Sequence, residues 1–342
     1  IRINRFGATT AEEFKKAMKD LQKQGMKDLI LDLQGNGGGY LNAAIDLANE
    51  FLGQKELIVY TEGRTAQRSE FFAKGNGEFR DGRLIVLVDE YTASASEIVS
   101  GAVQDWDRGI IVGRRSFGKG LVQRPIDLPD GSMIRLTIAR YYTPAGRCIQ
   151  KPYDSSTDYN KDLIDRFNHG ELMNADSIHF PDSLKVQTKK LGRTVYGGGG
   201  IMPDYFVPID TTLYTDYHRN LVAKGAVIKF TMKFIEGHRK ELANKYKKFE
   251  SFNEKFIIDD DMLATLREMG EKEGVKFNEE QYQKSLPLIK TQLKALIARD
   301  LWDMNEYFRV MNTTNESVQK ALEILNSEEY QKKLAEIICT GN

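Results

Sequence analysis

No run of apolar residues in this 342-residue sequence approaches the ~20 residues that a helix needs to cross a bilayer. The formal net charge is zero, because 49 basic residues balance 49 acidic ones. We therefore find no bulk attraction to nucleic acid or to an anionic membrane surface. No signal peptide is recognisable. Because Ile1-Arg2-Ile3 reads like the middle of a strand, we expect a fragment or a processed form, and the targeting segment stays undetermined.

Cysteine and histidine are both scarce. Cys148 and Cys339 are far apart and match no metal or redox spacing, so the sequence leaves open whether they are free or bridged. A Ser–His–Asp arrangement needs a histidine near its serine. The four histidines all lie outside the stretch 90–123 that carries the most informative serines: they are His169, His179, His218 and His238.

The pattern of apolar residues predicts two domains. In residues 1–210, short apolar runs alternate with helical spacing, and glycines follow the ends of the strands, which is typical of an α/β sheet with helices on its faces. Within this part, 151–194 is polar and rich in turn formers, so we expect a surface excursion. Residues 211–342 carry apolar stripes at helical spacing and predict a mainly helical domain.

The elements that we expect in the first domain follow from these runs and from their flanking glycines. They are strands at 1–6, 29–33, 57–61, 84–89, 109–112 and 205–208, a hairpin of 121–128 with 133–142, and helices at 10–25, 40–52 and 95–106.

Ser94 stands where the buried strand 84–89 hands over to the helix 95–106. It has two interpretations. As a structural residue it is the helix N-cap, since Glu97 is placed to complete a capping box with it. As a functional residue it presents a hydroxyl at the carboxyl end of a sheet, beside helix N–H groups that can stabilise an oxyanion.

Lys119 is the candidate base for that serine. A lysine acts as a general base when burial lowers its pKa towards neutrality. Gly118 and Gly120 flank it, which suits a tight loop close to another backbone. Gln123 is placed to hold the amine by a hydrogen bond.

A rival interpretation of the same lysine is a phosphate-binding loop, because Gly113–Lys119 reads G-x-x-x-x-G-K after an apolar run. Two features oppose it. Gly120 follows where a serine or threonine is needed, and the next residues predict a hairpin rather than the helix whose dipole binds the phosphate.

A second glycine-rich loop, Gly35–Gly39, follows the strand 29–33. It is either a plain turn or a group of backbone N–H donors that faces an anion. It lacks the G-x-G-x-x-G register, which disfavours a dinucleotide site. An oxyanion hole opposite Ser94 explains why the backbone would approach so closely.

Three segments combine at a distinctive spacing. They are Asp32–Gly39 (D-L-Q-G-N-G-G-G); Ser94–Ile98 (S-A-S-E-I) with Gln104-Asp105; and Phe117–Gly120 (F-G-K-G) with Val122-Gln123, which leads to Leu136–Gly146. Together they resemble the carboxy-terminal processing peptidases, also called tail-specific proteases. The resemblance covers about residues 1–150, and also Val195–Asp204 (V-Y-G-G-G-G-I-M-P-D).

This resemblance implies roles for individual residues. Ser94 corresponds to the nucleophile, Lys119 to the base and Gln123 to its support. Gly38 or Gly39, together with Ala95, correspond to the oxyanion hole. The resemblance also implies a crotonase/ClpP-like protease core that uses no metal and no cofactor.

The implied activity is that of a serine endopeptidase that cleaves proteins at or near their carboxy termini. The implied location is the periplasm or cell envelope, and the C-terminal helices are a possible homo-oligomer interface. An alternative is a non-catalytic ligand- or peptide-binding protein on the same scaffold. The sequence departs from the family in two ways: we find no PDZ-like G-L-G-F loop, and Gln34 replaces the usual arginine.

Overall fold

The structure, a computed structural model, describes residues 1–152 and 161–335. The chain divides into two compact units, one of residues 1–208 together with the residues from Lys320 on, and one of residues 209–319. The predicted domains, 1–210 and 211–342, differ from this division mainly because the described residues from Lys320 on belong with the first unit. The second cysteine, Cys339, lies outside the described residues.

A parallel sheet forms the centre of the first unit. Its strands are β1 (Leu29–Asp32), β4 (Leu84–Val88), β5 (Ile110–Gly113) and β10 (Tyr205–Phe206), in the order β1-β4-β5-β10. Every residue of β4 and β5 is buried. A parallel strand that is covered on both faces needs such a continuous apolar run.

A second, antiparallel sheet has the order β3-β2-β7-β6. Its strands are β2 (Leu57–Glu62), β3 (Ser69–Phe72), β6 (Leu121–Asp127) and β7 (Met133–Tyr142). The predicted hairpin of 121–128 with 133–142 is therefore confirmed. The strand β3, in contrast, is not among the strands that the sequence predicts.

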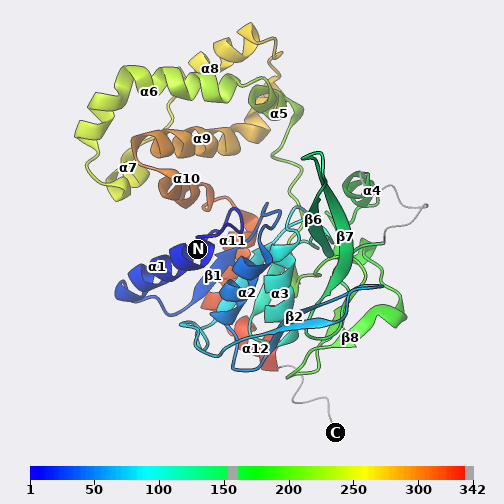
Figure 1. The fold of residues 1–342 in the computed structure, drawn as a ribbon. Helices are drawn as coiled ribbons and strands as arrows, with labels where there is room; N and C mark the ends of the chain where they lie inside the picture. Colours follow the sequence, from blue (N-terminus) through cyan, green and yellow to red (C-terminus); the bar gives the residue numbers. More distant parts are fainter. Residues whose placement is uncertain (153–160, 336–342) are drawn as a thin grey trace. The chain divides into compact units, whose positions relative to one another are not determined.

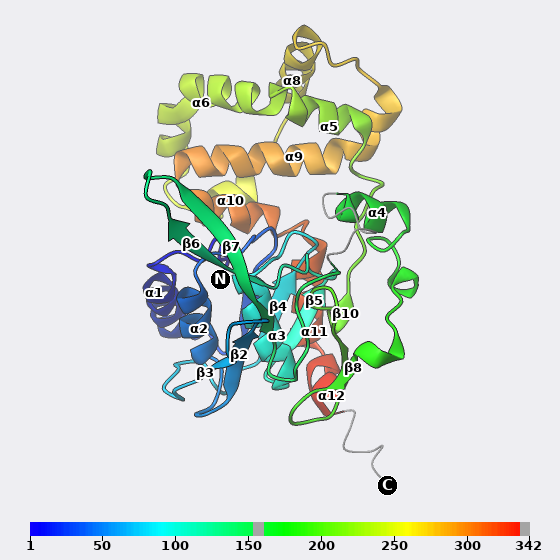
Figure 2. The same ribbon diagram turned by 45° about the vertical axis from the view of Figure 1, so that its right-hand side comes forward.

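The helices α1 (Thr10–Lys23), α2 (Leu41–Asn49) and α3 (Ala95–Asp105) follow the predicted ranges closely. All 11 residues of α3 are buried, because α2 and α3 pack between the two sheets (Figure 1). The helices α11 (Glu316–Asn326) and α12 (Glu329–Ala335) lie on the other side of the parallel sheet (Figure 2). There the Tyr330 hydroxyl accepts a hydrogen bond from the Leu84 N–H at 2.9 Å.

The expected strand at 1–6 is reduced to two isolated bridges, one between Arg2 and Asp32 and one between Phe6 and Gly39. Between these bridges, residues 33–38 leave the sheet to form the glycine-rich loop. Within the described part of the chain, residues 1–6 therefore have no continuous strand beside them with which to form a ladder of hydrogen bonds.

The polar excursion carries more structure than its composition suggests. It contains α4 (Asp162–Asn168), two short 3₁₀ helices at Ala175–Ser177 and Asp182–Leu184, and β8 (Lys185–Gln187), which pairs with β9 (Thr194–Tyr196). Its described residues from 161 on are therefore a folded part of the first unit.

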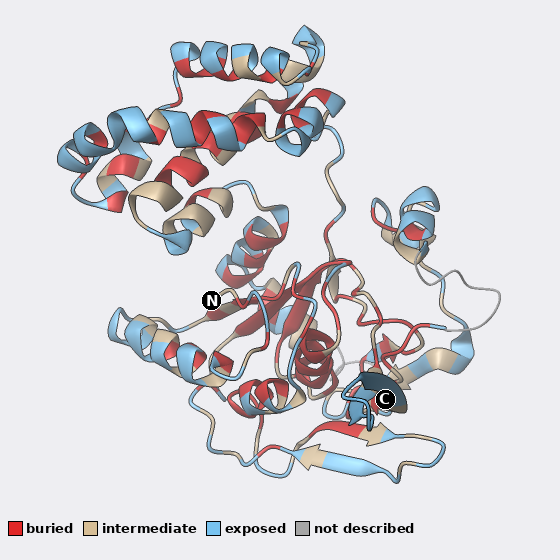
Figure 3. Ribbon diagram, turned by 45° about the horizontal axis from the view of Figure 1, so that its top comes forward, coloured by how far each residue is buried: buried red, intermediate tan, exposed pale blue. Residues whose placement is uncertain are grey.

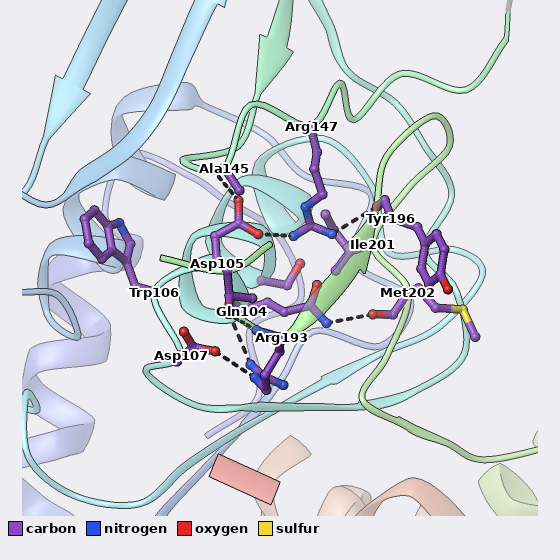
Figure 4. A network of polar contacts seen from close by, with 12 residues as sticks. Gln104, Asp105, Trp106, Asp107, Ala145, Arg147, Arg193, Tyr196, Ile201 and Met202 are labelled. Carbon is purple, nitrogen blue, oxygen red and sulfur yellow. Dashed lines mark hydrogen bonds and ion pairs between the residues drawn. The ribbon is translucent and has the colours of Figure 1, made fainter. Parts of the chain in front are cut away.

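Buried ion pairs fasten the C-terminal end of α3 to the loops around it (Figure 4). Asp105 and Arg147 form a pair in which both side chains are almost fully buried. Arg193 binds Asp107 at 2.7 Å and Asp204 at 2.6 Å. These pairs hold the C-terminal end of α3 in place.

The second unit is helical, as predicted, and has its own apolar core. Its helices are α5 (Asp216–Ala223), α6 (Ala226–Lys245), α7 (Phe249–Lys255), α8 (Asp260–Lys272), α9 (Glu279–Leu301) and α10 (Met304–Met311). Figure 3 shows that each long helix buries one stripe and exposes the other, as amphipathic spacing requires. Within residues 1–152 and 161–335, no helix combines the length and the apolar character needed to span a membrane.

Candidate active site

Three loops meet at one edge of the parallel sheet. They follow the neighbouring strands β1, β4 and β5 and comprise residues 34–39, 89–94 and 114–119. The carboxyl ends of adjacent parallel strands share an edge, where α/β proteins bind their ligands. Hydrogen bonds join the loops: the Gly35 N–H donates to Asp89 Oδ1 at 2.9 Å, and the Phe117 N–H donates to the Thr92 carbonyl at 2.9 Å.

Ser94 has a strained backbone. It is half-buried at the N-cap of α3, with φ 57° and ψ −113°. A residue with a side chain rarely adopts this conformation, which costs on the order of 1–3 kcal/mol and is concentrated at functional sites. The strain favours the functional interpretation of Ser94 over that of a simple helix cap.

Gly38 lies directly against this serine. Its φ is +95°, and a Cβ added to it would lie 2.7 Å from the Ala93 carbonyl oxygen, 2.8 Å from the Ser94 Cβ and 2.9 Å from the Ala95 nitrogen. Only glycine fits such a position. The glycine-rich loop therefore approaches the serine as the sequence predicts.

The candidate oxyanion donors differ in what their N–H groups bind. The Gly38 N–H donates to Asn36 Oδ1 at 2.9 Å. Within the described part of the chain, the N–H groups of Gly39 and Ala95 have no acceptor. Gly39 and Ala95 are therefore better placed than Gly38 to bind a developing negative charge.

Glu97 connects Ser94 to the lysine loop, residues 114–119. Its Oε2 accepts hydrogen bonds from the Ser94 N–H at 2.7 Å and the Lys119 N–H at 2.8 Å. The two backbone nitrogens therefore lie no farther apart than the sum of these distances. Its Oε1 accepts bonds from the Ser116 hydroxyl at 2.5 Å and the Gly118 N–H at 2.7 Å.

The Glu97 carboxylate is fully buried, and burial raises its pKa although its four hydrogen bonds act in the opposite direction. The sequence had indicated only a capping role for Glu97. An acid in the first turn of a helix does not reveal that it also binds a loop more than twenty residues away. Only the fold brings that loop to it.

The side chains of the predicted catalytic residues are less closely associated than their backbones. Lys119 is half-buried, and among the described residues no hydrogen bond joins its amine to the Ser94 hydroxyl. Gln123 is exposed on β6, beside a bulge between Val122 and Gln123. In the same described part, Gln123 makes no hydrogen bond to Lys119.

The phosphate-binding interpretation of Gly113–Lys119 is wrong. The residues after Lys119 form β6, not a helix. The loop therefore lacks the helix N-terminus that would bind a phosphate.

Comparisons with known proteins match the part of the chain that carries these three loops. Residues 1–157 match the family model described as "Peptidase family S41", and residues 217–303 match one described as "Family of unknown function (DUF8443)". The carboxyl-terminal-processing protease of Picosynechococcus sp. is 45% identical over 151 residues, which are 44% of this chain and 36% of that protein. The chloroplastic C-terminal processing peptidase of Tetradesmus obliquus is 40% identical over 151 residues, which are 44% of this chain and 32% of that protein.

A solved structure, the photosystem II D1 C-terminal processing protease, aligns with 62% of this chain and 42% of its own at 30% identity, with a TM-score of 0.45. The alignments cover about a third of the length of the two curated relatives named above. Residues 1–157 are thus similar to peptidase family S41, and for this part of the chain the resemblance to the carboxy-terminal processing peptidases is confirmed.

Proposed function

We propose that this protein is a serine endopeptidase that cleaves proteins at or near their carboxy termini, with Ser94 as nucleophile and Lys119 as base. The observation that carries the proposal is the Glu97 carboxylate, one oxygen of which accepts the N–H groups of both residues. The names of the curated relatives support the reaction class. We also propose that the protease core is crotonase/ClpP-like.

The reaction begins when Lys119, in its neutral form, takes the proton of the Ser94 hydroxyl. The serine oxygen attacks the carbonyl carbon of the scissile peptide bond and forms a tetrahedral intermediate. Lys119 then returns the proton to the leaving nitrogen, the C–N bond breaks, and an acyl-enzyme remains.

The oxyanion of the intermediate accepts hydrogen bonds from the N–H groups of Ala95 and of the glycine-rich loop. Loss of one such donor typically costs ~10²–10³-fold in kcat. Water then attacks the acyl-enzyme. Lys119 accepts a proton from that water and passes it back to Ser94, which restores the starting state. Gln123 would have to turn towards Lys119 to support it.

Degradation of an unfolded model protein tests the proposal. We expect Ser94→Ala and Lys119→Ala each to abolish cleavage while circular dichroism stays unchanged, because each substitution removes a reacting group and leaves the buried contacts of Glu97 in place. Equal cleavage by the wild type and both variants would refute the dyad. The alternative function, a non-catalytic binding protein on this scaffold, predicts that the wild type binds peptides without cleaving them.

The proposed substrates are carboxy-terminal tails of proteins, by analogy with the names of the relatives. We further propose an exported protein of the periplasm or cell envelope. Homo-oligomerisation through the C-terminal helices is also a proposal, and sedimentation of the purified chain would test it.

A further inference from the structure

The helix α4 is attached to the first unit by a charged residue. Arg166 is its buried residue, with 5% of its surface exposed, while Ile164 is 59% exposed and Phe167 is 43% exposed. An amphipathic helix ordinarily buries its apolar side chains and leaves its arginine in water. In α4 the arginine is buried and the apolar side chains are exposed. This indicates that the hydrogen bonds of Arg166 hold the helix in place.

Arg166 binds the backbone of the lysine loop. Its Nη2 donates to the Arg115 carbonyl at 2.7 Å, and its Nη1 donates to the Ser116 carbonyl at 3.2 Å. Its Nε donates to Glu171 Oε1 at 2.7 Å. The planar guanidinium thus connects two successive carbonyls of the loop to one carboxylate, which a lysine ammonium cannot reproduce.

Glu171 completes the cluster. Its two oxygens also accept hydrogen bonds from Arg115, with Nε at 2.7 Å and Nη2 at 2.6 Å. The two guanidinium groups hold the pKa of this carboxyl below its usual range, against the effect of burial. The acid is therefore charged near neutral pH and orients both arginines.

The lysine loop is consequently held from two directions. Glu97 accepts the N–H groups of Gly118 and Lys119, whereas Arg166 donates to the carbonyls of Arg115 and Ser116. The backbone of Lys151 adds a third contact, because its N–H donates to the Gly118 carbonyl at 3.0 Å. The conformation that presents Lys119 thus depends on residues well beyond the loop.

Arg166 and Glu171 lie outside both matched segments, residues 1–157 and 217–303. We propose that Arg166, oriented by Glu171, is a positioning residue that fixes the lysine loop and thereby places Lys119 against Ser94. This inference rests on the proposed function for its catalytic consequence. Its structural part stands alone: a segment that the S41 match does not cover holds the loop that carries the base.

The experiment compares Arg166→Gln, Arg166→Lys and the control Arg193→Gln in the full chain. Arg193 is a matched control, because it is also buried and forms ion pairs with two carboxylates, those of Asp107 and Asp204. Among the described residues, it binds no residue of the lysine loop. The readouts are kcat, KM and melting temperature, together with the hydrogen-exchange rates of the Gly118 and Lys119 amides.

We expect Arg166→Gln to lower kcat about 10- to 100-fold, because a small displacement of a catalytic group has effects of that size. We expect KM to change less than about threefold, since the loop is not assigned to substrate binding. Both amides should exchange faster. Arg166→Lys should resemble Arg166→Gln, and Arg193→Gln should lower the melting temperature without comparable effects on kcat or on these amides.

The inference is overturned if Arg166→Lys restores wild-type kcat, since charge alone would then suffice. It is also overturned if Arg193→Gln lowers kcat as much as Arg166→Gln, which would indicate general destabilisation. If the wild type cleaves nothing, the proposed function fails, and the amide exchange rates still decide whether Arg166 holds the loop.

Discussion

A side chain at position 38 has no space beside Ser94. Three atoms of Ala93, Ser94 and Ala95 lie within 2.9 Å of the place where its Cβ would be. Either the glycine-rich loop or the serine would have to move. The close approach of the glycine-rich loop to Ser94 therefore depends on the absence of a side chain at position 38.

We predict that Gly38→Ala lowers kcat/KM about 10²-fold, because the steric clash displaces the glycine-rich loop or Ser94, and a misplacement of about 1 Å can have an effect of that size. The measurement is the cleavage rate of an unfolded protein. Gly131→Ala is the matched control, because Gly131 has a similar φ of +82° but no heavy atom within 4 Å of its added Cβ. The control shares the backbone strain and should keep its activity; equal losses in both variants would contradict the steric explanation.

Glu97 is the second residue whose replacement should be severe. In Glu97→Gln, an amide NH₂ replaces one oxygen and faces at least one backbone N–H group that it cannot bind. Each buried donor left unpaired costs about 1–3 kcal/mol. We predict a loss of a few kcal/mol in the free energy of unfolding, measured in urea, together with a loss of activity.

Glu50→Gln provides the comparison for Glu97. Glu50 is also buried, at 1% exposed, and it accepts the Glu78 N–H at 3.0 Å, outside the loops 34–39, 89–94 and 114–119. This variant should lose stability but keep its cleavage rate per folded molecule. A Glu97→Gln protein that cleaves as fast as Glu50→Gln would show that Glu97 does not order the site.

At the scale of the elements, helix α5 contains a buried histidine, His218. His218 is 4% exposed, its Nε2 lies 2.9 Å from Gln292 Oε1, and its Nδ1 has no partner among the described residues. Burial lowers the pKa of His218 below its ordinary value of 6.5. A second proton on the ring would leave a buried donor unpaired.

The sign of the pH effect follows from this lowered pKa. As the pH falls through 6.5, the ordinary pKa of histidine, His218 binds a proton in the unfolded chain but not in the folded unit. The free energy of unfolding therefore decreases. We predict that residues 209–319 lose stability between pH 7 and about pH 5. His218→Gln should reduce this pH dependence, whereas the same change at the exposed His238 should not; equal effects would exclude His218 as the cause.

At the scale of the whole molecule, each unit has an apolar core of its own. Units with separate cores tend to unfold separately. Leu293 in α9 and Leu31 in β1 are both fully buried, one in each core. Replacing either with alanine should cost about 2–5 kcal/mol in its own unit.

We therefore predict two calorimetric transitions. Leu293→Ala should lower the temperature of one, and Leu31→Ala should lower the temperature of the other. A single transition that both substitutions shift equally would contradict independent cores.

Local patterns in the sequence were sufficient to predict the strands β1, β4 and β5, the helix α3 and the β6–β7 hairpin. Each depends on a contiguous apolar run or on a turn, and such signals act over a few residues. The glycine-rich loop and Ser94 could be identified in the same way, because an unusual backbone conformation requires unusual residues. The family motifs 32–39, 94–98 and 117–120 are also short and contiguous.

Only the tertiary structure decided which residues, distant along the chain, form hydrogen bonds and ion pairs with one another. Glu97 reads as a capping acid, Arg166 lies in a segment that predicts a surface excursion, and α11 and α12 read as part of the helical domain. Their partners, the lysine loop and the parallel sheet, come from strands far away along the chain. Hydrogen bonds and ion pairs act over about 3 Å in space, and no pattern along the chain records which groups folding brings within that distance.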